Sequence, residues 1–291
     1  MKPPPFQYHE PREIGEACEL LASLENAKVL AGGQSLVPML NMRFVFPDHV
    51  VDLNRIPDLA FVHEVDGRIR IGAMTRQREL ERSSLIRERC PLMGEALPFV
   101  GHRQTRNRGT IGGSLCHLDP AAELPVVAMT LDATVHVRSV RGERAIPMPE
   151  FPAFYMTPSI EPDELVTGIE FTPWPEGHGH AFVEFARRHG DFAMVASAAL
   201  LEVSRDGIIE RAAVCVGGVG TGPLRCTDVE AAVVGTRGGP DVYSRATAAC
   251  REIDAMEDVH ATQAYRRHLA QVLTARALET AYARALAEPA T

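Results

Sequence analysis

The chain has 291 residues, of which 45% are hydrophobic and 23% charged, and its formal net charge is −8 at pH 7. These values are typical of a globular protein with a sizeable core, and the acidic balance argues against nonspecific binding to nucleic acid or an anionic membrane. Residues 1–5 lack the apolar region of a secretory signal, and no apolar run approaches the ~18 residues of a spanning helix, so we expect a cytoplasmic protein.

The six cysteines are too dispersed for a metal-binding motif. They stand at positions 18, 90, 116, 215, 226 and 250, and no two form a Cys-x-x-Cys pair. Zinc sites and iron–sulfur clusters are usually held by closely spaced cysteines, so we interpret all six as buried apolar thiols. His178 and His180 have no further ligand near them in the sequence, and no metal site is expected on this chain.

The first 57 residues alternate between short strand-like and helix-like segments, which predicts a small α/β unit. At 14–24, apolar residues recur at helical spacing and glutamates occupy the opposite face. Other elements are expected as a strand and turn at 6–12, strands at 28–30 and 50–53, and a short helix at 37–44.

Residues 58–173 predict a second unit of the α+β type. Residues 61–72 alternate around Asp66-Gly67 and predict a hairpin. Asp119 is expected to cap a helix whose first residue is Pro120, because proline is favoured at that position. The remaining expectations are a helix capped by Thr75, a helix from Cys90 towards His102, strands at 131–138 and 164–171, and a charged turn at 139–145.

Residues 174–291 predict a third unit, an antiparallel sheet with helices. It follows a linker rich in proline and glycine at 172–180. The expected strands lie at 181–187, 195–203 and 209–216, and the expected helices at 228–234, 246–253 and 265–287.

A glycine pair at Gly32 and Gly33 follows the predicted strand at 28–30. Glycine adopts positive φ at little cost, and consecutive N–H groups can then turn inward to form a concavity for an anion. Gln34 and Ser35 add neutral hydrogen-bonding groups. Taken alone, this segment is better explained as a plain glycine turn between a strand and a helix, because glycine pairs are common in turns.

A second segment at 106–115 repeats this design, with Gly112 and Gly113 standing 80 positions after the first pair. Two such loops predict two walls around one extended anion, and a dinucleotide pyrophosphate fits that description. The sequence contains neither a Gly-x-Gly-x-x-Gly segment after a strand nor a Gly-x-x-x-x-Gly-Lys-Ser/Thr segment. A Rossmann domain and a P-loop nucleotidase are therefore disfavoured.

The segments at 31–38 and 107–123 together resemble the FAD-binding medium subunit of molybdenum hydroxylases, the family of xanthine dehydrogenase, aerobic carbon monoxide dehydrogenase and quinoline or nicotine dehydrogenase. The resemblance covers nearly the whole chain. It implies an α+β protein with the two-subdomain FAD-binding fold of the vanillyl-alcohol-oxidase (PCMH) type. The subdomains would be residues 1–57 and 58–173, followed by a C-terminal α+β domain of the CO-dehydrogenase type at 174–291.

The resemblance also implies which residues contact FAD. Segments 31–36 and 110–114 would line the pyrophosphate and ribityl chain, Glu123 would bind the adenosine ribose, and Leu165 and Val166 would flank the adenine through backbone groups. The candidate FAD-binding residues are Ala31, Gly32, Gly33, Gln34, Ser35, Leu36, His102, Thr110, Ile111, Gly112, Gly113, Ser114, Asp119, Glu123, Leu165 and Val166.

Several of these residues keep two interpretations. Asp119 is either a helix cap or a cofactor contact, and His102 is either solvated or directed to the flavin. Arg103, Arg106 and Arg108 neutralise phosphate or face solvent or a partner. The turn at 187–193 resembles a family turn and faces the flavin or a neighbouring subunit, while the lysine that some relatives carry near Glu184 is absent.

The function implied by the resemblance is electron transfer in a three-chain enzyme. A large subunit would carry the molybdopterin cofactor, a small subunit two [2Fe–2S] clusters, and this chain the FAD that reduces an external acceptor; a dimer of heterotrimers is the expected assembly. No catalytic side chain is expected here, because the cofactor performs the chemistry. The alternatives are a free-standing flavin oxidase or dehydrogenase and a non-redox nucleotide-binding assembly module.

Overall fold

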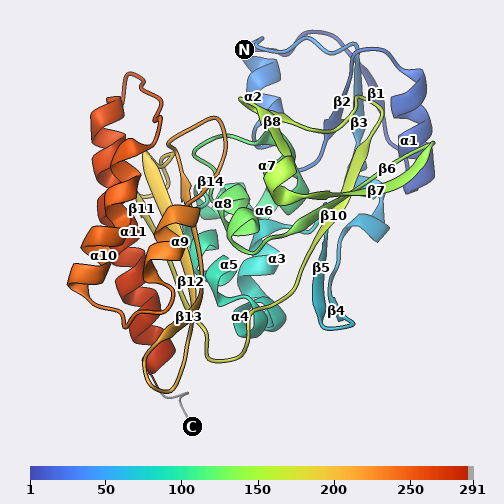
Figure 1. Cartoon of the computed structure of the whole chain (residues 1–291). Helices are drawn as coiled ribbons and strands as arrows, with labels where there is room; N and C mark the ends of the chain where they lie inside the picture. The colour runs from blue at the N-terminus through green and yellow to red at the C-terminus, as the bar shows by residue number, and fades with distance from the viewer. Residues whose placement is uncertain (288–291) are drawn as a thin grey trace.

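A computed structural model describes residues 1–287 and contains three main sheets with helices packed between and around them (Figure 1). The expected α+β class is confirmed. Short 3-10 turns lie at Leu53–Arg55, Pro57–Leu59, Leu97–Phe99, Met148–Glu150 and Thr247–Glu252. None of the helices described is both long enough and apolar enough to span a membrane.

The first sheet is parallel and has the strand order β1-β3-β2. Its strands are β1 (Gln7–His9), β2 (Ala27–Leu30) and β3 (His49–Asp52), and its helices are α1 (Ile14–Ser23) and α2 (Leu36–Asn41). Ala17 and Leu21 of α1 pack with Val51 of β3 in a small core. Because the strands are parallel, the segments that follow β2 and β3 leave the sheet at the same edge.

The second sheet is antiparallel and has the order β4-β5-β10-β6-β7. Its strands are β4 (Val62–Val65), β5 (Arg68–Gly72), β6 (Thr134–Ser139), β7 (Gly142–Pro147) and β10 (Leu165–Phe171), and β8 (Pro152–Phe154) and β9 (Thr157–Pro158) form a separate hairpin. The expected turn at 139–145 is wrong, because Ser139 pairs with Gly142 and β7 begins there. β7 is an edge strand with mostly exposed side chains, so it lacks the alternation that marks a half-buried strand.

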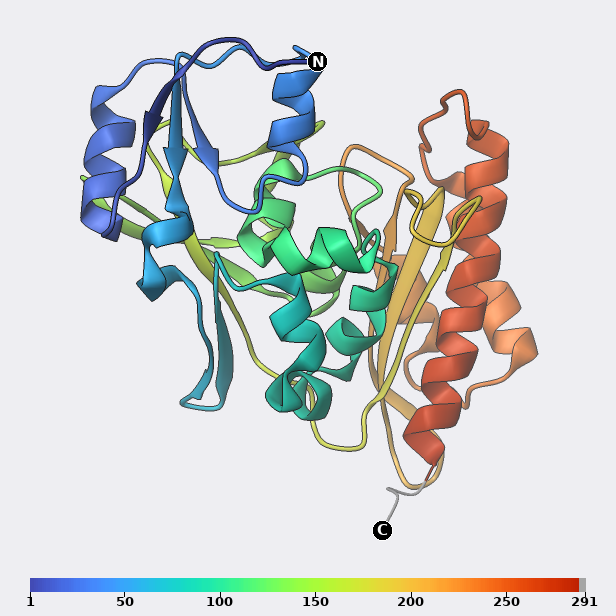
Figure 2. The same cartoon turned by 180° about the vertical axis from the view of Figure 1, so that it is seen from behind.

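Six helices of the middle segment lie between the second and third sheets (Figure 2). They are α3 (Gln77–Arg82), α4 (Ser84–Arg89), α5 (Pro91–Ala96), α6 (Arg103–Arg108), α7 (Ile111–His117) and α8 (Glu123–Thr130). α8 is almost entirely buried and packs against the third sheet. This layer of helices therefore joins the two halves of the molecule.

The third sheet is antiparallel, with strands β11 (Gly179–Phe185), β12 (Val195–Val203), β13 (Ile209–Gly217) and β14 (Leu224–Arg225) in that order. α11 (Gln263–Leu286) covers its outer face, with α9 (Thr227–Val233) and α10 (Pro240–Ala246) beside it (Figure 1). The expected helix at 246–253 is present as a 3-10 helix at Thr247–Glu252, whereas α10, which ends just before it at Ala246, is not among the expected helices. Pro240 at the first position of α10 is the signal that the sequence interpretation missed.

One ion pair ties the middle helices to the third sheet. Glu95 of α5 accepts hydrogen bonds from Arg284 of α11 at 2.7 and 3.1 Å and from the backbone N–H of Phe182 at 3.2 Å. Phe182 is buried and belongs to the core formed with the middle helices, whereas the neighbouring Ala181 packs towards α11. β11 therefore presents alternate side chains to two different cores.

Candidate cofactor-binding site

The first glycine motif forms an open turn between β2 and α2. Gly33 has φ of +74°, as expected for a glycine in this turn. Within the described chain, the backbone N–H groups of Gly33, Gln34, Ser35 and Leu36 donate to no other group, whereas Val37 donates to the Gly33 carbonyl. Four consecutive amides therefore stay available for an external acceptor, as an anion-binding turn requires.

The second glycine motif is a helix start, not a loop, so this part of the sequence interpretation is wrong. Thr110 caps α7 by accepting a hydrogen bond from Gly113 N at 3.0 Å. Ile111 N and Gly112 N donate to the Thr75 and Ala73 carbonyls at 3.2 and 2.9 Å. These three amides are used inside the protein, which contradicts the expectation that backbone dipoles of both motifs turn towards the anion.

Glycine is needed in the second motif because α7 packs tightly on neighbouring backbone. A Cβ placed on Gly112 would be 2.6 Å from the Ala73 Cβ, which is too close for two carbon atoms. A Cβ on Gly113 would be 3.6 Å from that of Ala31, an ordinary contact. Gly113 therefore lies beside the first motif, and the two motifs meet as the sequence predicted.

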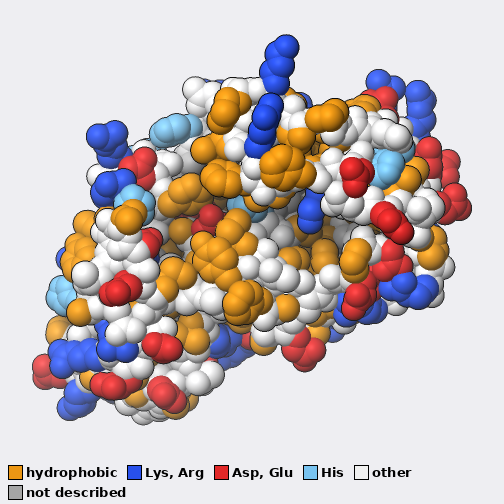
Figure 3. Space-filling view, turned by 90° about the horizontal axis from the view of Figure 1, so that it is seen from above, with side chains coloured by type: hydrophobic (Ala, Val, Ile, Leu, Met, Phe, Trp, Pro, Cys, Tyr) orange, Lys and Arg blue, Asp and Glu red, His pale blue; other side chains and the backbone are white. Residues whose placement is uncertain are grey.

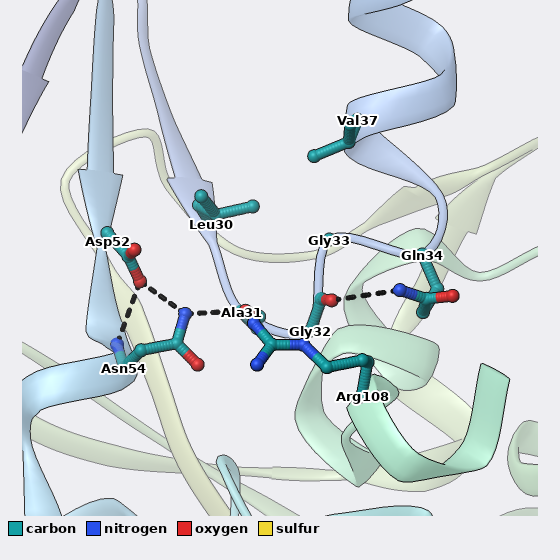
Figure 4. Close-up of a pocket in the computed structure, with 9 residues that line it drawn as sticks. All are labelled: Leu30, Ala31, Gly32, Gly33, Gln34, Val37, Asp52, Asn54 and Arg108. Atoms are coloured by element: carbon teal, nitrogen blue, oxygen red, sulfur yellow. Dashed lines mark hydrogen bonds between the residues drawn. The ribbon is translucent and has the colours of Figure 1, made fainter. Parts of the chain in front are cut away.

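A pocket of about 230 Å³ opens at this junction (Figure 4). It is lined by residues 30–34 at the end of β2 and in the first motif, by Val37, by Asp52 at the end of β3, by Asn54 just after it, and by Arg108 at the end of α6. Among the candidate residues, Ala31, Gly32, Gly33 and Gln34 line it. Ser35, Leu36 and segment 110–114 lie next to it in sequence or space without forming its wall.

A hydrogen-bond network that the sequence interpretation missed holds the pocket together. Asn54 Nδ2 donates to the Ala31 carbonyl at 3.0 Å and to the Asp52 carboxylate. Arg76 donates through Nη2 to Asn54 Oδ1 at 2.6 Å and through Nη1 to the Arg108 carbonyl. The carboxylate of Asp52 also accepts a hydrogen bond from Tyr8 at 2.6 Å, and the pKa of Tyr8 is raised to about 12 chiefly by that bond.

A sequence signal for Asp52 and Asn54 did exist. Ligands of parallel sheets bind beyond the carboxyl ends of the strands. Asp52 is the last residue of β3 and Asn54 follows it, at the same edge of the sheet where Ala31 follows β2. Arg76 had no such signal, because it reaches the pocket only through the packing of the second sheet beside the first.

The three arginines of α6 lie in different environments. Arg106 is buried, pairs with Glu81 at 3.0 Å and donates to the carbonyls of Pro98, Val100 and Gly101. Arg103 is exposed on the same helix. Only Arg108 lines the pocket, so the structure leaves it as the candidate for contact with phosphate.

The segment before α8 differs from the expectation. Asp119 does not cap a helix, because its Oδ1 accepts a hydrogen bond from Ala121 N at 2.9 Å and α8 begins only at Glu123. Leu118 at φ of +49° ends α7 and turns the chain. Glu123 is 7% exposed, and burial raises the pKa of its carboxyl to about 7.

A second carboxyl with a raised pKa, that of Glu184, lies on the third sheet and is influenced by the charge of Glu123. Glu184 of β11 shares a strand face with the buried Phe182, and its Oε2 is buried without a hydrogen-bond partner in the described chain. Burial first, and the charge of Glu123 second, raise the pKa of Glu184 to about 8. Neutral carboxyls at this junction can donate hydrogen bonds, which ionised carboxylates cannot.

The other candidates lie apart from the pocket. A Cβ on Gly190 would be 2.5 Å from His102 Nδ1, so the turn at 187–193 packs on the His102 ring. Leu165 and Val166 are buried, and only their backbone could meet a ligand. β5 pairs with β10 from Gly168 onward, so the backbone edge of Leu165 and Val166 on that side is not covered by β5.

The face that carries the first motif is apolar. Figure 3 views the molecule from the side that is at the top of Figure 1, near which α2 and β8 lie, and hydrophobic side chains gather on part of this surface. The exposed large apolar residues in α2, in the segment just after it and in the β8–β9 hairpin are Val37, Met42, Phe44, Phe46, Phe154 and Tyr155. Such a concentration is typical of a protein interaction surface.

Comparisons with known proteins match nearly the whole chain. The family model described as the FAD binding domain in molybdopterin dehydrogenase matches residues 4–174, and that of the CO dehydrogenase flavoprotein C-terminal domain matches residues 180–281. The chain is 42% identical to the 6-hydroxypseudooxynicotine dehydrogenase complex subunit alpha of Paenarthrobacter nicotinovorans, over 98% of this chain and 97% of that protein. It is 33% identical to the carbon monoxide dehydrogenase medium chain of Hydrogenophaga pseudoflava, over 98% and 99%.

Solved structures agree with this assignment. A chain of the Hydrogenophaga pseudoflava carbon monoxide dehydrogenase superposes with a TM-score of 0.95 at 34% identity, covering 98% of this chain and 99% of that chain. Quinoline 2-oxidoreductase from Pseudomonas putida 86 gives 0.94 at 31% identity, covering 99% and 100%. The FAD-binding fold with a C-terminal domain, expected from the sequence, is therefore confirmed.

Proposed function

The chain belongs to the FAD-binding medium subunits of the molybdopterin dehydrogenases, and we propose that it conducts electrons through FAD in a three-chain molybdenum hydroxylase. Its relatives are subunits of oxidoreductases. In the proposal, a large partner carries the molybdopterin cofactor and a small partner carries two [2Fe–2S] clusters. Electrons from these clusters reach the FAD of this chain and then an external acceptor.

The observation that carries the proposal is the contact between the two glycine motifs beside a pocket with four available amides. Any side chain on Gly32 or Gly112 would collide with backbone or with Ala73, so the junction is built for close approach. A cradle of this kind fits a diphosphate. When bound, FAD supplies the redox chemistry, and the residues of this chain hold and orient it.

The roles of the individual residues are part of the proposal. Segment 31–36 would bind the diphosphate through backbone amides, and Thr110 and Ser114 would contribute hydroxyls rather than amides. Glu123 would meet a ribose hydroxyl, and Leu165 and Val166 the adenine through their backbone. His102, Ile111, Gly112, Gly113 and Asp119 would shape the surrounding wall.

The assembly is proposed on separate grounds. The relatives are named as a subunit of an enzyme complex and as a medium chain. The exposed apolar face around α2 and β8 is suited to a protein partner. We extend this to a dimer of heterotrimers. A cytoplasmic location also belongs to the proposal, and the six cysteines, all unpaired, are those of a protein from a reducing compartment.

Co-expression of this chain with the neighbouring reading frames tests the proposal. We expect the purified chain to take up FAD, and the bound flavin to be reduced by substrate only in the presence of both partners. Folded chain without flavin absorption bands, before or after addition of FAD, would contradict it. Substrate turnover by the lone chain would favour a free-standing flavin oxidase, and a released nucleotide without a flavin ring would favour an assembly module.

A further inference from the structure

We propose that Arg108 is the cation that makes this pocket selective for ligands with a diphosphate, by closing over the first glycine motif from the side of the second. The inference rests on the proposed binding of FAD and adds the group that neutralises the ligand's charge. It names a charged side chain, whereas the backbone amides and hydroxyls of the two motifs are neutral.

The position of Arg108 is the first argument. It is the last residue of α6, and its side chain lies across the turn of residues 31–33 in the pocket (Figure 4). Arg106, two residues earlier, is committed to Glu81, but Arg108 forms no ion pair within the described residues. An exposed guanidinium at the mouth of a pocket is available to bind phosphate oxygens in a bidentate manner.

The charge balance of the pocket is the second argument. The wall contains one cation, Arg108, and one carboxylate, Asp52. Both oxygens of Asp52 are occupied, by Tyr8 on one side and by Asn54 on the other, so this carboxylate is held within the protein network. The only charged side chain of the wall without a partner in the described chain is therefore positive.

A second guanidinium strengthens this balance. Arg76 reaches the same junction and donates to the carbonyl of Arg108. Burial first, and the positive charge of Arg108 second, lower the pKa of Arg76, while Glu79 and Asp52 oppose this shift. Two guanidinium groups at close range repel, and an anion bound between them would relieve the repulsion.

The use of the backbone amides is the third argument. The first-turn amides of α7 donate to Thr75, Ala73 and Thr110, so the second motif cannot compensate a diphosphate with these dipoles. The first motif offers four amides, which carry no net charge. A diphosphate carries two negative charges, and a side-chain cation is the remaining way to offset them at this junction.

This assignment predicts the class of ligand. FAD and ADP both contain the diphosphate, whereas riboflavin contains the flavin ring without it. Arg108 should therefore contribute to the affinity for FAD and ADP and leave that for riboflavin unchanged. Because the interaction is ionic and exposed, its contribution should also fall as salt concentration rises.

The test compares FAD, ADP and riboflavin binding to the full-length chain, by calorimetry at low and high salt, in the wild type and in Arg108→Gln, Arg108→Lys and Arg103→Gln. We expect Arg108→Gln to weaken the affinity for FAD and for ADP by about 10- to 100-fold, and to make both affinities less dependent on salt concentration. Arg108→Lys should recover part of the loss, because lysine restores the charge but not the planar fork. Arg103→Gln, an exposed change on the same helix, should have no effect.

Each contrary result has a distinct meaning. A wild-type chain that binds neither FAD nor ADP would overturn the proposed function and this inference with it. FAD affinity and salt dependence unchanged in Arg108→Gln would overturn the inference alone. An equal loss for riboflavin would also overturn it, because the side chain would then act on the shape of the pocket and not on the diphosphate.

Discussion

Gly32 lies directly against Gly109: a Cβ atom placed on Gly32 would be 2.8 Å from the Gly109 Cα, and closer still to the Arg108 carbonyl oxygen. Gly32 follows β2 of the parallel sheet and Gly109 follows α6 of the middle helices, so the contact joins two parts of the chain that pack around different cores. The same Arg108 carbonyl accepts a hydrogen bond from Arg76. The candidate site is thus a junction whose geometry depends on the absence of one methyl group.

Gly32→Ala should therefore disrupt the junction. Excess volume against rigid backbone typically costs about 1–3 kcal/mol, and we expect this loss in the free energy of unfolding together with weaker FAD binding. Gly94→Ala is the matched control, because Gly94 lies within α5 with nothing within 4 Å of its added Cβ. It should raise stability by about 0.5–1 kcal/mol. Urea unfolding and flavin titration of both variants give the comparison, and equal behaviour would contradict the close-packing argument.

The glycine motifs were visible in the sequence because they are local patterns with a local cause. Gly33 has positive φ, and Gly112 and Gly113 follow the cap residue Thr110 closely. The residue types alone therefore point to a turn or to a close backbone contact. Their meeting in space was an inference from the resemblance between the two segments. The structure bears out the meeting, while the contacts of the individual residues with FAD stay a prediction.

Other features could not be found in this way, because tertiary packing decides them. The helical state of Gly112 and Gly113 depends on carbonyls from residues 73 and 75, which belong to a distant part of the sequence. The late start of α8 follows from the turn that Asp119 forms with Ala121. A rule that assigns helix caps from residue type alone cannot distinguish this turn from a cap.

Arg266 should be a major contributor to stability, although it lies outside the pocket. Its side chain is 4% exposed and donates through Nη1 to the carbonyls of Met194 and Gly218 at 2.5 and 2.7 Å, and through Nη2 to Asp258 at 2.7 Å. Gly218 N in turn donates to the Pro120 carbonyl at 2.8 Å, which links the third sheet to the segment before α8.

Arg266→Met would leave two buried carbonyls without donors. We expect the free energy of unfolding to fall by about 2–4 kcal/mol, since buried acceptors that lose a charged donor are costly. Arg276→Met is the control, because Arg276 is exposed on the same helix, and its effect should stay within about 0.5 kcal/mol. Denaturant unfolding of the two variants would refute the expectation if their midpoints matched.

The carboxyls of Glu123 and Glu184 should give the chain a pH dependence of stability. Their pKa values are raised by burial to about 7 and about 8, with Asp119 adding to the shift of Glu123 and Arg106 opposing it. A carboxyl whose pKa is raised on folding stabilises the folded state fully at pH values below its unfolded pKa of about 4.3, and this contribution is lost as the pH rises through the folded pKa. The pair should therefore lower stability between about pH 5 and about pH 9.

Glu184→Gln removes one titrating group and keeps the shape of the side chain. The variant should lose part of this pH dependence. Its free energy of unfolding should therefore fall less between acidic and alkaline pH than that of the wild type does. Glu210→Gln, an exposed change on β13, should keep the wild-type profile. The measurement is urea unfolding at a series of pH values, and identical slopes in wild type and Glu184→Gln would rule out the proposed titration.

Asn54 and Arg76 should act as one unit in holding the first motif. Asn54 binds the Ala31 carbonyl and accepts a hydrogen bond from Arg76, so either substitution breaks the same chain of contacts. We expect Asn54→Ala to weaken FAD binding about tenfold, which corresponds to one or two lost hydrogen bonds.

Because Asn54 is exposed, the free energy of unfolding should change little more in Asn54→Ala than in Asn107→Ala, an exposed control on α6. The double variant with Arg76→Ala should lose less than the sum of the two single losses, since coupled residues are not additive. FAD titration of the four proteins measures the coupling, and strict additivity would show that the two side chains support the pocket independently.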